Sequence, residues 1–294
     1  MARLIVVMLA MVCALVVPAS AFPVLGSGTG YVYLPNAQVV AAHTGEVTAA
    51  YVHTNGENDL SGLADGGFIC KGNSYSLGAR IGLAEGKAEL GIGVQRVNKS
   101  YGDATIYSIA GKYKFYDNSK AGLSSALGVG YSNRSTDMTL TVFGGTLKEE
   151  LPNTTSVYLT VDKTWPENAS GVSGVVTIGA NYTNFSSTRQ VASTGTVGVP
   201  GGFPIDADGN VESQGFVRPL VGVKVSKQDW DFLAEYTPAM SKGGLHYQDK
   251  LWSAAVRKAV KPNLILTAGL TTFNLPFASS DTGYFLSAAY AFGK

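Results

Sequence analysis

Charged residues are scarce in this chain of 294 residues, where Asp, Glu, Lys and Arg together make up only 15%. Typical soluble domains carry about 25% charged residues, so something other than water is expected to cover part of this surface. The 22 basic and 21 acidic residues almost cancel. This balance excludes the strongly basic surface that nucleic acids require.

Cysteines and long apolar runs are also scarce. The only cysteines are Cys13 and Cys70, which excludes a fold held together by several disulfides. Beyond the N-terminus, no apolar run is long enough for a membrane-spanning helix. Almost no segment has a helical period, so a helical membrane protein and a coiled coil are excluded as well.

Residues 1–21 have the three parts of a secretory signal peptide. Arg3 precedes an apolar run over residues 4–17, and the small residues Ala-Ser-Ala at 19–21 form a cleavage site. The alternative is a membrane anchor, but the apolar run is short for that role. We therefore expect an exported mature chain. Removing Arg3 from the 22 basic residues leaves 21, equal to the 21 acidic residues.

Large and small residues alternate along most of the remaining chain. Leu127 and Val129, for example, alternate with Ala126, Gly128 and Gly130. A period of two predicts β-strands, and these segments are longer than the five or six residues usual in soluble sheets. The twelve predicted strands begin near Glu46, Ser74, Lys87, Ala104, Ala121, Thr154, Gly171, Gln214, Asp229, Tyr247, Asn263 and Tyr284.

The two faces of these strands predict a membrane-spanning barrel. The bulky face would meet lipid, while the face of Gly, Ser, Thr and isolated charges suits an enclosed, wet or polar interior. Short connections such as 84–86 and 227–228 alternate with long ones such as 186–213, as in outer-membrane barrels. An open sheet edge is not viable in hydrocarbon. We therefore predict a closed antiparallel transmembrane β-barrel of about twelve strands over residues 45–294, located in a bacterial outer membrane.

Two segments resemble known families. The alternating run over residues 284–292, which ends in the aromatic Phe292, resembles the C-terminal strand of Gram-negative outer-membrane proteins. The chain departs from that pattern by adding Gly293 and Lys294. The resemblance implies recognition by the barrel-assembly machinery through Tyr284, Leu286, Ala288, Tyr290 and Phe292. Residues 28–37 and Gly45 look like the start of YjbH-like barrels, a family linked to exopolysaccharide production.

Several charged residues fall on the inward face of the predicted strands. They could line a lumen that passes small polar solutes, or they could pair with one another and hold a closed polar interior. Twelve strands do not decide between the two, because smaller barrels are filled and larger ones are open. The predicted lumen residues are Glu46, Arg80, Glu89, Lys112, Lys114, Asp162, Arg218, Lys224, Asp231, Glu235 and Arg257.

The segment 22–44 precedes the first predicted strand and could either enter the lumen as a plug or form a periplasmic tail. We expect insertion, because Val39 and Val40 would gain nothing by exposure to water. In the loop 186–213, Asp206, Asp208 and Asn210 resemble half of a calcium loop. Asp-Gly is also a common hairpin turn, and we predict no metal site and no cofactor.

The functional prediction is a narrow channel or transport-related pore. The alternative is a structural or interaction barrel whose extracellular loops bind partners or surface polysaccharide. An enzyme ranks third, because His43, His53 and His246 are the only histidines and none is spaced for a catalytic triad. The expected partners are outer-membrane lipid, lipopolysaccharide and the assembly machinery, with no nucleic acid; the sequence leaves the oligomeric state open.

Overall fold

The computed structural model describes most of the chain. The described residues are 30–54, 68–69, 72–99, 102–136, 138–142, 145–149, 153–185, 191–193, 214–242, 245–248, 250–272, 278–279 and 282–293. The predicted signal peptide, Cys70 and the half calcium loop at Asp206, Asp208 and Asn210 all lie outside these residues. Within the described ranges, no helix is long and apolar enough to cross a membrane.

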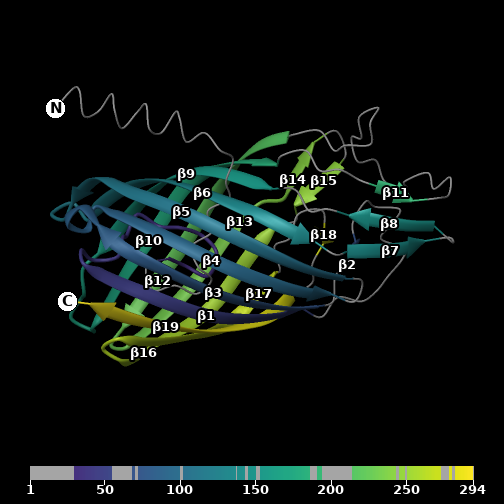
Figure 1. Ribbon diagram of the computed structural model, residues 1–294. Helices are drawn as coiled ribbons and strands as arrows, with labels where there is room; N and C mark the ends of the chain where they lie inside the picture. Colours follow the sequence, from purple (N-terminus) through teal and green to yellow (C-terminus); the bar gives the residue numbers. More distant parts are fainter. Residues whose placement is uncertain are drawn as a thin grey trace.

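Twelve antiparallel strands form a closed barrel (Figure 1). Each barrel strand is hydrogen-bonded to the barrel strands that precede and follow it in the chain, and the last strand pairs with the first. The predicted closed antiparallel barrel is confirmed. The barrel strands are β1 (Thr44–Thr54), β3 (Gly72–Leu83), β4 (Ala88–Lys99), β5 (Gly102–Asn118), β6 (Leu123–Thr136), β9 (Thr154–Trp165), β10 (Val172–Phe185), β12 (Gln214–Lys227), β13 (Trp230–Thr237), β16 (Leu251–Lys261), β17 (Leu264–Thr272) and β19 (Thr282–Gly293).

The two ends of the barrel differ. Short connections join β3 to β4, β5 to β6, β9 to β10, β12 to β13 and β16 to β17. Because the strands are antiparallel, these connections share one end, called here the short-turn end, where β1 begins and β19 finishes. The opposite end is called the loop end.

Short strands that the sequence did not predict lie at the loop end (Figure 1). They form three small sheets outside the barrel order, and Tyr247, expected to open a barrel strand, belongs to one of them. Backbone groups in loops too long for tight turns can pair within one loop or with a neighbouring loop. These strands are β2 (Phe68–Ile69), β7 (Met138–Val142), β8 (Gly145–Glu149), β11 (Val191–Ser193), β14 (Met240–Lys242), β15 (Leu245–Gln248) and β18 (Ala278–Ser279).

The strands present large apolar side chains outward. Along β9, Val157 and Leu159 are 38% and 46% exposed, whereas Tyr158 and Thr160, which alternate with them, are 5% and 0% exposed. Strands with this pattern are lipid-facing outside and enclosed inside in membrane barrels. Exposed aromatic residues gather near both strand ends, as in the girdles that such barrels place at the two membrane interfaces: Tyr75, Tyr107, Tyr236 and Tyr284 near the loop end, and Phe115, Trp165, Trp230, Tyr290 and Phe292 near the short-turn end.

The seam between the first and last strands includes Gly293, the residue that follows Phe292. β1 and β19 pair from Thr44↔Gly293 to Thr54↔Gly283. A Cβ on Gly45 would lie 2.4 Å from the Phe292 ring, so the ring covers this glycine. Gly293 has a φ of +95° and still belongs to β19. The predicted assembly residues Tyr284, Leu286, Ala288, Tyr290 and Phe292 share the outward face of this strand.

Candidate functional site in the barrel lumen

Residues 30–43, called here the inner segment, lie against inward-facing side chains of the barrel wall. Tyr31, Val32, Leu34 and Ala37 are each less than 5% exposed. A backbone hydrogen bond from Tyr31 N to the Leu34 carbonyl closes a turn. The segment reaches the wall near the start of β1, where Ala42 forms a parallel bridge with Gly82.

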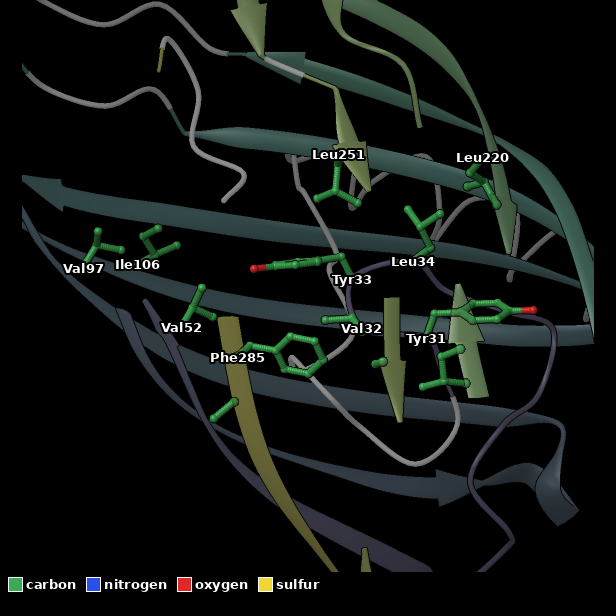
Figure 2. Close-up of a cluster of buried hydrophobic side chains, with 13 residues drawn as sticks. Tyr31, Val32, Tyr33, Leu34, Val52, Val97, Ile106, Leu220, Leu251 and Phe285 are labelled. Carbon is green, nitrogen blue, oxygen red and sulfur yellow. The ribbon is translucent and has the colours of Figure 1, made fainter. Parts of the chain in front are cut away.

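Apolar residues of the barrel wall surround this turn (Figure 2). In the figure, the Tyr33 ring extends toward Val97 and Ile106. The wall residues come from seven strands and include several near the loop end, so the inward face is not only small and polar as expected. This apolar layer was not predicted from the sequence, because alternation with a period of two shows which face a side chain lies on but not which residues it contacts. Its wall members are Ala50, Val52, Val97, Ile106, Leu220, Leu233, Leu251, Ala255 and Phe285.

Three wall carboxylates hold the inner segment by its main chain. Glu235 on β13 accepts hydrogen bonds from Tyr33 N, at 2.9 and 3.2 Å to its two oxygens, and from Leu34 N at 2.8 Å. Asp162 on β9 accepts from Ala37 N at 3.0 Å. Glu89 on β4 accepts from Val40 N at 2.9 Å. These bonds satisfy buried N–H groups that would otherwise have a large desolvation penalty.

Two further contacts fasten the start of the segment. Arg257 Nη2 donates to the Gly30 carbonyl at 2.9 Å. The hydroxyl groups of Tyr31 and Thr177 are 2.9 Å apart, and Thr177 in turn donates to Asp162 at 2.7 Å. The segment is thus bound by β9, β10, β13 and β16 as well as by β4.

A network of ion pairs spans four neighbouring strands toward the short-turn end. Arg80 on β3 contacts Glu46 on β1 at 2.8 Å and Glu89 on β4 at 3.7 Å. Lys112 on β5 contacts the same oxygen of Glu89 at 3.0 Å. Glu46, Arg80 and Lys112 are buried to more than nine-tenths. Buried ions are tolerated when opposite charges lie this close.

The remaining predicted lumen residues occupy different environments. Asp231 and Arg257 form an ion pair at 3.8 Å, and Lys224 is partly buried on β12. Lys114 forms an ion pair with Asp117, whose side chain is 52% exposed, beside a β-bulge in β5. This pair is separate from the ion pairs of the other predicted lumen residues. Arg218 is 2% exposed, and no ion pair links it to another described residue.

Glycines in the wall mark where the inner segment approaches most closely. A Cβ on Gly82 would lie 2.0 Å from the Ala41 carbonyl oxygen, and one on Gly222 would lie 2.4 Å from the Tyr31 ring. Glycine allows such close backbone contacts. Inward-phased glycines were therefore the one sequence signal that could have located the segment. The sequence does not say which of many glycines faces it.

Replacing Gly222 by alanine is expected to displace Tyr31. The added methyl group would overlap a ring, and overpacking of this kind typically costs about 1–3 kcal/mol. Limited proteolysis of the refolded protein should cut the inner segment faster in Gly222→Ala. Gly91→Ala is the matched control, because its Cβ would meet its nearest atom at 3.4 Å. Equal cleavage rates in the two variants would contradict the described contact.

No group of His, Cys, Asp and Glu residues suited to a metal ion occurs in the described part of the chain. The site is thus a barrel interior built from an apolar layer, a network of ion pairs and a main-chain segment anchored by carboxylates.

The closed barrel with an apolar exterior and a lined interior has the fold of an outer-membrane β-barrel protein. The COG4313 outer membrane channel from Pseudomonas putida F1 is similar in structure, with a TM-score of 0.54, 12% sequence identity, and coverage of 91% of this chain and 100% of that one. The NanC porin has a TM-score of 0.51 at 8% identity, covering 83% and 98%. The β-domain of the Bordetella autotransporter BrkA has a TM-score of 0.50 at 12% identity, covering 85% and 100%.

At these identities the likeness concerns the fold alone. No protein-family model matches the chain, and no curated protein matches it. The resemblance of residues 28–37 to YjbH-like barrels therefore stays a prediction.

Proposed function

We propose that this protein is an outer-membrane channel for small polar solutes and that the inner segment closes it in the conformation described here. The apolar outward face and aromatic girdles support an outer-membrane location. The same arrangement supports contacts with membrane lipid and lipopolysaccharide, and the outward face of β19 is the surface that the assembly machinery would read. We propose neither a catalytic role nor a cofactor.

The observation that carries this proposal is how the inner segment is held. Glu235, Asp162 and Glu89 bind it through main-chain N–H groups, and hydrogen bonds of this kind can be broken without breaking the chain. When the segment leaves, water and cations can take the place of its N–H groups as partners of these carboxylates. The exposed lumen would then be lined by both signs of charge, which suits the passage of small polar solutes.

Deleting residues 22–41 from the mature chain tests the proposal. We expect the full-length protein to be mostly closed in planar lipid bilayers, and the deletion variant to show stable, several-fold larger conductance because the lumen has lost its occupant. Circular dichroism and a heat-dependent gel shift would verify that each protein forms a barrel. A folded deletion variant that never conducts would overturn the channel proposal.

The second candidate is a structural or interaction barrel, and the apolar layer favours it. Tyr31–Leu34 bury wall residues such as Val97, Leu251 and Phe285, as the core of a permanently filled barrel would. Such a barrel would bind partners or surface polysaccharide through its long loops, most of which lie outside the described residues. Absence of current in both proteins, together with loss of surface polysaccharide binding on loop deletion, would favour this candidate.

A further inference from the structure

Arg218 differs from the other buried cations of the barrel. Arg80, Lys112 and Arg257 each have a carboxylate within 4 Å. Arg218 is as deeply buried, at 2% exposure, yet its single hydrogen bond to a described residue runs from Nη1 to the Pro238 carbonyl at the long distance of 3.5 Å. Its Nε has no hydrogen-bond partner among the described residues.

A guanidinium cannot lose its charge in a protein. A buried cation without an anion is strongly unfavourable, and the network around Glu46 and Glu89 lies toward the other end of the barrel. Arg218 belongs to the loop half, near the start of β12 at Gln214. Its planar fork of donors fits a carboxylate in two-point geometry.

Asn181 supplies the complementary group. Asn181 and Arg218 are direct cross-strand partners of β10 and β12, which places their side chains side by side on the inward face. The Asn181 amide nitrogen donates to Thr183 Oγ1 at 3.2 Å, and the buried Oδ1 has no partner among the described residues. Within the described residues, Arg218 Nε is thus a donor without an acceptor and Asn181 Oδ1 an acceptor without a donor, on two residues that are cross-strand partners.

We propose that Arg218 and Asn181 form a binding site in the loop half of the lumen for a small hydroxy-carboxylate. The carboxylate accepts from the Arg218 guanidinium, and a hydroxyl of the same molecule donates to Asn181 Oδ1. This inference rests on the proposed function for the entry of solute into the lumen. It names anionic, hydroxylated solutes as the class that the channel selects.

Calorimetric titration of the detergent-solubilised protein with D-gluconate tests this site. Gluconate should bind to the full-length chain or to the variant lacking residues 22–41, and neutral D-glucose should not. Arg218→Gln should weaken gluconate binding by about tenfold or more, because it removes a charge-assisted contact. Asn181→Leu should weaken gluconate binding but leave acetate, which has no hydroxyl, unchanged. Lys227→Gln, an exposed position on the same strand, is the matched control.

The outcomes separate this site from the channel itself. One outcome is that gluconate binds and that Arg218→Gln abolishes this binding, while neither the full-length protein nor the folded variant lacking residues 22–41 conducts. This outcome would support the site and overturn the channel. Conductance with no gluconate binding to either form of the protein would overturn the site and leave the channel standing. If Arg218→Gln does not fold, Arg218→Lys keeps the charge without the planar fork, and unchanged affinity in that variant would also overturn the proposal.

Discussion

Replacing Arg80 by alanine is expected to lower the free energy of unfolding by about 3–5 kcal/mol, the usual result of removing one partner from a buried ion pair. Arg80 contacts both Glu46 and Glu89, and its loss would leave Glu46 as a buried carboxylate without that cation. Urea titration of the protein in lipid vesicles, followed by tryptophan fluorescence and gel shift, would measure the change.

Lys114→Ala is the matched control for Arg80→Ala. Lys114 also forms an ion pair, but its partner Asp117 is half exposed, and pairs of this kind contribute about 0–1 kcal/mol. The two variants should therefore differ by several-fold in their effect on stability. Similar effects would mean that the network around Arg80 is reached by water in the folded protein.

Glu235→Ala is expected to release the turn of the inner segment. The variant removes the acceptor of Tyr33 N and Leu34 N and of the Ser253 hydroxyl. Each buried N–H left without a partner costs about 1–3 kcal/mol. The free energy that holds the segment against the barrel wall should therefore fall by about 2–6 kcal/mol for the two N–H groups together.

Hydrogen exchange read by mass spectrometry would detect this release. Peptides that cover residues 30–43 should exchange much faster in Glu235→Ala, while peptides from β4 and β5 should keep their protection. Glu167→Ala, at an exposed position in the connection after β9, should match the unmodified protein. Unchanged exchange in Glu235→Ala would show that the apolar layer alone holds the segment.

Much of the barrel was predictable because each strand repeats the same local rule. The alternation of Leu127 and Val129 with Gly128 and Gly130 needs no knowledge of distant residues, since successive side chains of any strand point to opposite faces. All twelve barrel strands were found in this way. The boundary near Tyr247 was wrong because a short outer hairpin, β14–β15, intervenes before β16.

The interior was harder to predict, because its contacts join residues far apart in the chain. Tyr33 and Glu235, or Tyr31 and Thr177, meet only after closure. Val97 and Phe285 belong to the apolar layer of the inward face, and nothing near either residue in the chain indicates that Tyr31–Leu34 will cover them.

The sequence by itself determined the architecture of this protein, since strand length, face polarity and the alternation of short and long connections are all local properties. Strands of this kind must close into a barrel in lipid, because an open edge would leave backbone groups unpaired in hydrocarbon. Only the tertiary structure decided which charges pair, which glycines lie under the inner segment, and that Arg218 stands apart from every described carboxylate. Pairing depends on register around the whole circumference and on the path of the chain through the interior, and neither is encoded in any one stretch of residues.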